Sequence, residues 1–420
     1  MGGFRLWMSQ TFGALEERNF RLLWLGQTGS SVGDGLSFVA IVFAVLGIGG
    51  SATDIGLVFA AFSLPHVVFL LAGGVWADRL PRNLVMMGAD GLRAVVQVGL
   101  ALVMFTGTAE VWHIIVAAAL HGTASAFFQP ASTGMMPQVV SPGRLQQANA
   151  LMALSRGFAF VLGPAVSGLI VAAGGPGYVF ALDGLTYLLS MVTLAMLHLP
   201  PPPPASEREP FLHELAVGWR EVRSRTWLLA SLITFGISNV ALGSSQVLGP
   251  LIVDRELGGA AAWGFISTAG AVGALIGGAI ALRWRPSRPL LVAFLVMMLS
   301  IPRALFLIPP LGVAALAGAA LLALVAIQLS NTLWETVLQQ RVPQASLSRV
   351  SSYDWVVSLA FQPIAFAIVG PMTELIGETE TLLLFGALGL ANLVVLLVPD
   401  VRNMRRLDIE EVPANGLQTS

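Results

Sequence analysis

Cysteine is absent from this sequence, which excludes disulfides, thiol nucleophiles, iron–sulfur clusters and cysteine zinc sites. Lysine is absent too, so all 22 basic residues are arginine. Charged residues make up only 11% of the 420 residues, whereas soluble domains carry about 25%. Hydrophobic residues make up 55%. A chain with this balance cannot cover itself with a polar surface, and the composition predicts an integral membrane protein with many spans.

The motifs of several enzyme classes are also missing. His213-Glu214 lacks a second histidine four residues later, so there is no zincin motif. No glycine-rich loop ends in Lys-Ser or Lys-Thr, which argues against direct use of ATP. No nucleophile and base stand at a catalytic spacing. We therefore expect no enzymatic activity, no bound metal and no cofactor.

Long apolar runs fill most of the chain, and each approaches the length of about 20 residues that a spanning helix needs. They predict an all-α fold with twelve spans. These are Phe20–Leu46, Ile55–Ala77, Leu84–Thr106, Val111–Met135, Gln146–Ala173, Tyr178–Leu199, Trp227–Val253, Trp263–Leu282, Pro289–Leu307, Val313–Trp334, Val350–Met372 and Thr381–Val398.

Arginines are distributed unequally between the loops on the two sides of these spans. Among the loops on one side only Arg255 is basic, while the other side holds many arginines. The positive-inside rule then predicts that both termini are cytoplasmic. The first segment, Met1–Arg21, is expected to be a cytoplasmic lead-in rather than a cleaved signal peptide. We expect a multi-pass protein of a bacterial inner membrane.

The two halves of the chain resemble each other. Met136–Arg144 aligns with Val342–Arg349 after a one-residue gap, at equivalent places among the spans. A repeat of six spans predicts two pseudo-symmetric six-helix bundles, over residues 1–199 and 227–399, with a cytoplasmic tail at 400–420.

Residues 200–226 are expected to link the bundles. Five prolines, Pro200–Pro204, form a stiff spacer that cannot continue a helix. After them, apolar residues recur at helical spacing beside several arginines. This pattern predicts either an amphipathic helix on the inner leaflet or a merely solvated linker. The apolar positions are Phe211, Leu215, Trp219 and Val222.

Asp34 lies midway along the first span, between Gly33 and Gly35. Thirteen residues separate it from Arg21, which places it roughly 20 Å from the inner surface. A charged group at that depth is costly and needs a reason. Asp34 is a candidate proton carrier, and the alternative is a carboxylate permanently paired for structure. Arg156, in the fifth span, is a possible partner.

Asp90 and Arg93 are three residues apart in the third span and therefore share a helix face. A structural ion pair is the favoured interpretation, with Arg93 able to reach toward the interface. We include Asp90, Arg93 and Arg156 with Asp34 as candidate proton-coupling residues. Asp183, near the outer end of the sixth span, is expected to be a water-accessible cap.

A charged turn between the second and third spans carries Gly74, Asp78, Arg79 and Arg82. Its spacing resembles the loop that marks the major facilitator superfamily, with Pro81 in place of a glycine. An ordinary basic hairpin is the alternative. The resemblance implies a conformational switch in which Asp78 latches the loop against the start of the eleventh span.

The fifth span contains Gly163, Pro164 and Gly168, which permit a bend and close helix packing. They resemble the antiporter motif of exporters in that superfamily, although Ala159 and Ser167 replace two of its glycines. Together with the twelve spans, the sequence is similar to the drug and siderophore exporter branch, which includes macrolide-efflux and enterobactin-exporter-like proteins. Ala118 stands where the fourth-span arginine of the superfamily would fall, so Arg156 or Arg93 would have to replace it.

The resemblance implies proton-coupled antiport of a lipophilic or amphiphilic small molecule, such as a drug, an antibiotic or a siderophore, by alternating access. The alternatives are a proton-coupled importer of a small nutrient and a non-transporting sensor or scaffold. The expected partners are the substrate, protons and the lipid bilayer, with no nucleic acid, and the protein is expected to be a monomer. Uncharged residues are the candidate cavity lining: Phe38, Phe127, Asn239, Gln246, Gln328, Asn331, Trp355, Phe361 and Gln362.

Overall fold

A computed structural model describes residues 13–197, 219–220, 222–342 and 344–405. These residues form helices joined by short turns, and they contain no β-strand. The helices of the first half, after a short 3-10 turn η1 at Gly13–Glu16, are α2 Arg18–Gly47, α3 Ala52–Arg79, α4 Arg82–Phe105, α5 Val111–Val139, α6 Leu145–Gly174 and α7 Pro176–Ala195.

The second half holds four long helices and two interrupted ones. The long helices are α9 Thr226–Glu256, α10 Gly259–Arg283, α13 Val313–Arg341 and α14 Gln344–Ile376. The ninth span consists of α11 Pro289–Val296, η3 Met297–Ser300 and α12 Pro302–Leu305, and the twelfth of α15 Glu378–Leu388, α16 Ala391–Val394 and η4 Val395–Leu397, before α17 Pro399–Arg402.

The twelve-span fold predicted from the sequence is confirmed. Ten described helices are long and apolar enough to cross a membrane, and Pro289–Leu305 and Ala360–Ile376 are shorter apolar segments. The ninth and twelfth spans are interrupted helices. Pro302 has no N–H to donate, so the ninth helix is interrupted before it, and a new helical turn begins at Pro302. The twelfth breaks at Gly389, whose backbone lies against the side chain of Ile301 in the ninth.

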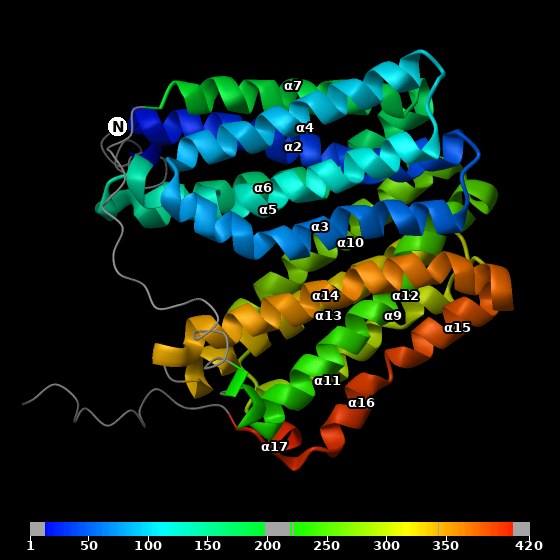
Figure 1. Cartoon of the computed structure of the whole chain (residues 1–420). Helices are drawn as coiled ribbons and strands as arrows, with labels where there is room; N and C mark the ends of the chain where they lie inside the picture. The colour runs from blue at the N-terminus through cyan, green and yellow to red at the C-terminus, as the bar shows by residue number, and fades with distance from the viewer. Residues whose placement is uncertain (1–12, 198–218, 221, 343, 406–420) are drawn as a thin grey trace, which may run out of the picture.

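The two halves form separate bundles, which Figure 1 shows one above the other. Helices pair in the same way in each: α2 packs on α7 as α9 packs on α15, and α3 packs on α5 as α10 packs on α13. Between the halves, α6 packs on α10 and α3 on α14. A two-fold axis that relates the two halves would interchange these two contacts. Parallel six-helix repeats produce this arrangement.

The halves meet at the end of the molecule that lies away from the termini. There the backbones approach so closely that a Cβ atom added to Gly56 of α3 would lie 2.2 Å from the carbonyl oxygen of Phe366 in α14. Nearer the ends of the same two helices, the Thr53 hydroxyl donates to Glu374 at 2.7 Å. In Figure 1 the bundles diverge toward the opposite end, where the N-terminus lies.

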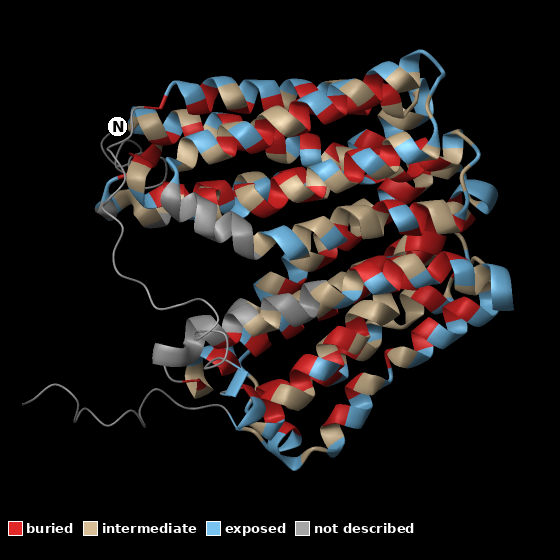
Figure 2. Ribbon diagram, viewed as in Figure 1, coloured by how far each residue is buried: buried red, intermediate tan, exposed pale blue. Residues whose placement is uncertain are grey.

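Burial follows the faces between helices, as Figure 2 shows. Large apolar side chains also point outward, including Val95, Leu154 and Leu375, which is 79% exposed. A soluble protein avoids such a surface, whereas a bilayer solvates it. Most of the linker, including Phe211 and Leu215, lies outside the described residues. Val222 is buried in an apolar cluster of the second half, so this position of the expected amphipathic face packs on protein rather than on lipid.

Candidate functional site

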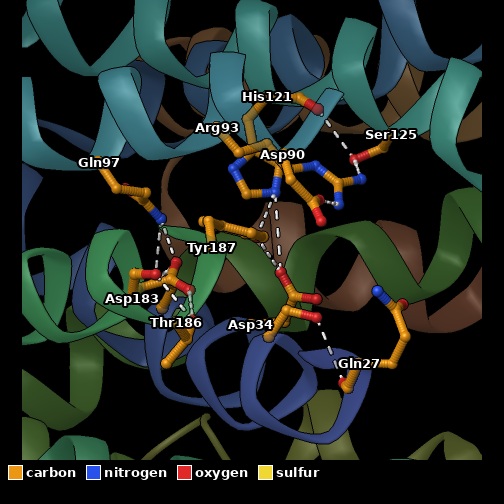
Figure 3. A network of polar contacts seen from close by, with 12 residues as sticks. Gln27, Asp34, Asp90, Arg93, Gln97, His121, Ser125, Asp183, Thr186 and Tyr187 are labelled. Atoms are coloured by element: carbon orange, nitrogen blue, oxygen red, sulfur yellow. Dashed lines mark hydrogen bonds and ion pairs between the residues drawn. The ribbon is translucent and has the colours of Figure 1, made fainter. Parts of the chain in front are cut away.

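Polar side chains from four helices converge inside the first bundle (Figure 3). Helix α2 supplies Asp34, helix α4 supplies Asp90 and Arg93, and helix α7 supplies Asp183 and Tyr187. His121 comes from α5. Residues three or four positions apart lie on one helix face, so α4 and α7 each present two of these groups one above the other. The network therefore has two adjacent levels, one around Arg93 and one around Asp183.

Arg93 is the cationic centre of the first level. One guanidinium nitrogen lies 3.3 Å from an Asp90 carboxylate oxygen, and another donates to the Ser125 hydroxyl at 2.8 Å. The other Asp90 oxygen accepts from the Ser190 hydroxyl at 2.7 Å. The guanidinium carbon also lies 4.6 Å from the ring centroid of Phe128, within the range of a cation–π contact.

The ion pair predicted from the spacing of Asp90 and Arg93 is therefore present, with both side chains buried. The expectation that Arg93 reaches toward the membrane interface was wrong. Its guanidinium turns inward because Asp90, Ser125 and Phe128 together offer a carboxylate, a hydroxyl and a ring face, which replace the water that the interface would supply.

Asp34 is the accessible acid of the network. The Tyr187 hydroxyl donates a hydrogen bond to Asp34 Oδ1, and His121 Nε2 lies 3.8 Å from the same oxygen. The Asp34 side chain is nevertheless 50% exposed, although it lies in the middle of a span. A polar group at that depth that is both hydrogen-bonded and open can exchange with water inside the protein.

Arg156 does not take part in these contacts. It lies on an exposed face of α6, where its Nε donates to the carbonyl oxygen of Met152 one turn earlier. The partners of Asp34 are instead Tyr187 and His121, neither of which was singled out as a partner from the sequence. A role for Arg156 in proton coupling stays a prediction.

Asp183 occupies the second level, and its expected place as a water-accessible cap was wrong. Its exposed fraction is 0%. Its carboxylate accepts hydrogen bonds from Ser37 Oγ at 2.6 Å, from Gln97 Nε2, and from Thr186 Oγ1 at 3.3 Å. Helix α7 starts at Pro176, so Asp183 lies two turns inside it, on the face that packs against α2 and α4. The sequence did carry a signal for the burial of Asp183, namely the polar residues that occur in otherwise apolar spans.

The predicted switch loop is shorter than the sequence suggested. Gly74, Asp78 and Arg79 belong to helix α3, and α4 begins at Arg82 after a turn of two residues. The side chains of Asp78 and Arg79 lie outside the described part of the chain. Arg82 donates to the carbonyl oxygen of Gly134 in α5, which ties the turn to its own bundle. The latch formed by Asp78 stays a prediction.

The predicted antiporter motif lies where α6 contacts two other helices. Gly163 faces the backbone of Gly35 in α2, closely enough that an added Cβ would lie 2.6 Å from it. Gly168 similarly faces the carbonyl oxygen of Ala260 in α10, at 2.5 Å. Pro164 lies inside α6 between them, and its carbonyl oxygen faces Gly264. The motif thus packs one helix against both its own bundle and the other.

The candidate cavity residues come from both bundles. Asn239 and Gln362 lie together, with Gln362 Nε2 at 3.4 Å from Asn239 Oδ1 across α9 and α14. Phe38 and Phe361 are exposed. The remaining residues, apart from Trp355, whose side chain is not described, are partly buried or exposed on α5, α9 and α13: Phe127, Gln246, Gln328 and Asn331. Their contact with a substrate stays a prediction.

Comparisons with known proteins agree with this architecture. A sequence model described as Major Facilitator Superfamily matches residues 23–358. The enterobactin exporter EntS of Escherichia coli O157:H7 is 28% identical over 411 residues, which cover 94% of this chain and 96% of that protein. Its counterpart in Shigella boydii serotype 18 is 28% identical over 401 residues, covering 92% of this chain and 93% of its own.

Solved structures share the fold at low identity. The nucleoside transporter NupG superposes with a TM-score of 0.70 at 12% identity, covering 90% of this chain and 98% of its own. A bacterial homologue of the human lysosomal transporter Spinster, in an inward-facing and unoccupied conformation, gives 0.65 at 14% identity, covering 90% and 94%.

Proposed function

This chain belongs to the major facilitator superfamily, and on that premise we propose that it is a secondary exporter that exchanges protons for a lipophilic or amphiphilic small molecule. Its place is a bacterial inner membrane, with both termini cytoplasmic. Export is supported by the similarity to enterobactin exporters over almost the whole chain. The class of substrate is supported by the uncharged candidate lining residues, which suit a partly apolar compound.

Asp34 is the observation that carries the proposal of proton coupling. An acid in the middle of a membrane span is expensive unless it is paired or functional. Asp34 has no arginine or lysine within ion-pair distance in the described structure, and its side chain is half exposed. Such an acid can take up a proton from one side and release it to the other as access alternates.

The arrangement of the halves suits this cycle. The bundles touch at the end away from the termini and diverge at the end that carries them. With the termini in the cytoplasm, this is an inward-open state, from which a substrate enters from the cytoplasm. Rocking of the bundles about the α3–α14 and α6–α10 contacts would then open the other side.

Transport in everted membrane vesicles tests the proposal. Vesicles with the wild-type chain should accumulate a dye, an antibiotic or a siderophore from a panel, and a protonophore should abolish the uptake. The Asp34→Asn variant should fall to the level of vesicles without the protein. Asp400→Asn, which removes an exposed acid at the surface, is the matched control and should transport normally.

Two results would contradict the proposal. Protonophore-sensitive transport that persists in Asp34→Asn would remove Asp34 as the proton site. Movement of the compound in the opposite direction, driven by the same proton gradient, would make the protein an importer.

A further inference from the structure

The charges of the buried network do not balance. Among the described residues at this site, three carboxylic acids, Asp34, Asp90 and Asp183, face one guanidinium, that of Arg93. The ion pair of Arg93 is with Asp90. Two acids are left without a directly bonded cation, and they differ in access: Asp34 is half exposed, whereas Asp183 is sealed from water.

We propose that Asp183 is a second proton-binding site, closed to water, that exchanges its proton with Asp34. The proposal rests on the proposed function, since it gives the exchanged proton a place in the coupling cycle. In the transfer the O–H bond of the Asp183 carboxyl breaks and one forms on the Asp34 carboxylate. Asp183 becomes the carboxylate, and no electron changes hands.

The groups around Asp183 can satisfy either protonation state. Its hydrogen-bond partners are two hydroxyls and one amide, all neutral: Ser37, Thr186 and Gln97. A hydroxyl can donate to a carboxylate or accept from a carboxyl, so Ser37 serves both forms. Thr186 has a second acceptor at 2.7 Å, the Asp183 backbone carbonyl oxygen, to which its proton can return. A site that is fully bonded in both states can load and unload.

The charged and titratable groups that face this site come from each packed helix. Asp34 lies on α2, Asp90 and Arg93 lie on α4, His121 lies on α5, and Tyr187 shares α7 with Asp183. On α6, Arg156 points to an exposed face. Asp34 repels a second negative charge nearby, so the two acids are expected to share protons rather than ionise together.

Helix contacts place the two acids at neighbouring levels of the α2–α7 contact. A Cβ atom added to Gly33 would lie 2.1 Å from Asp183 Oδ1, so this carboxyl rests on the α2 backbone directly before Asp34. One turn further along α7, Tyr187 donates to Asp34. Any sliding of α2 against α7 must therefore change the surroundings of both acids at once. Gly33 is required here because a side chain would displace the carboxyl.

Infrared spectroscopy of the full chain in lipid measures the protons directly. Protonated carboxyls give a carbonyl band that disappears on ionisation, and we would titrate it in wild type, Asp34→Asn and Asp183→Asn, with Asp400→Asn as control. We expect two buried bands that respond to pH, one lost in each network variant. After transfer to deuterated water, the Asp183 band should shift more slowly than the Asp34 band.

A second variant keeps the proposal testable if Asp183→Asn does not fold. Gln97→Met removes one donor, so the Asp183 band should move to higher frequency while the Asp34 band stays. A single titrating band that is lost in Asp34→Asn alone would overturn the proposal, as would an Asp183 band that sodium ions shift but pH does not. These outcomes leave proton-driven export untouched. Conversely, two titrating bands in a protein whose transport ignores protonophores would refute the proposed coupling and keep the second site.

Discussion

The interface of α2 with α7 and that of α9 with the twelfth span occupy equivalent places in the two bundles, yet their polar groups differ in kind. The first holds Asp183, bonded to Ser37, and the second holds Asn392, whose amide donates to Ser238 Oγ and to the Gly389 carbonyl oxygen, both at 2.9 Å. An amide gives the same shape and a fixed set of hydrogen bonds, but it cannot bind and release a proton at neutral pH. The repeat thus keeps the packing of this interface but places an acid there only in the first half.

Helix continuity differs between the halves in the same places. Helices α4 and α7 run unbroken, while the ninth and twelfth spans, which correspond to them, are interrupted and touch each other at their breaks. An interrupted helix cannot hold two side chains one turn apart as firmly as α4 holds Arg93 and Gln97. Regular winding in the first half is therefore part of what positions the two levels of the network.

Removing Arg93 should affect the first half most. Arg93→Met leaves Asp90 buried without its cation, and breaking a buried pair in this way typically costs about 3 kcal/mol or more. We expect a clear loss of thermal stability in detergent. The double variant Asp90→Asn with Arg93→Met removes both charges and should regain most of the loss. Equal stability of the single variant and wild type would show that the pair contributes nothing.

Asn392→Asp places an acid at the interface of α9 with the twelfth span, where the second half has an amide. A carboxylate there would face the Gly389 carbonyl oxygen, so the folded chain must keep this acid protonated to donate to it. The unfolded chain loses the proton freely, so stability should fall as pH rises, by about 1–3 kcal/mol from acidic to alkaline conditions. Unfolding measured across pH tests this, with wild type as reference. A loss independent of pH would mean that Ser238 and its neighbours reorganise around the carboxylate.

Gly168→Ala tests the contact between the halves and leaves the acids alone. The added methyl group would lie 2.5 Å from the Ala260 carbonyl oxygen, so α6 and α10 must separate at a cost of about 1 kcal/mol or more. Spin labels on the two helices should report a longer distance. In the control, Gly99→Ala, the methyl group meets nothing within 4 Å, and the distance should not change. Identical distances in all three proteins would show that this contact is not tight.

The sequence was sufficient for the spans and for the acid in the first of them. A run of about twenty apolar residues rarely forms anything other than a membrane-spanning helix, and a lone aspartate in such a run is conspicuous. The Asp90–Arg93 pair followed from helical spacing alone. These features are local, and local rules predict them.

What the sequence could not reveal depends on how helices are rotated against one another. The contact between His121 and Tyr187 joins residues 66 positions apart, and the burial of Asp183 depends on which face α7 turns to α2. Arg156 and Arg93 look alike in the sequence, but Arg156 is exposed and Arg93 is buried inside the bundle. Pro302 could have produced a mild kink, and the structure shows that it ends a turn of 3-10 helix instead.

The interrupted ninth span also has a consequence for the surrounding lipid. It runs only from Pro289 to Leu305, and four of its residues are wound as the more extended 3-10 helix. At about 1.5 Å per α-helical residue and about 2.0 Å per 3-10 residue, it reaches about 27 Å, just short of the hydrocarbon thickness of about 30 Å. Along this edge the bilayer must thin slightly, so phospholipids with shorter acyl chains should gather beside the second half.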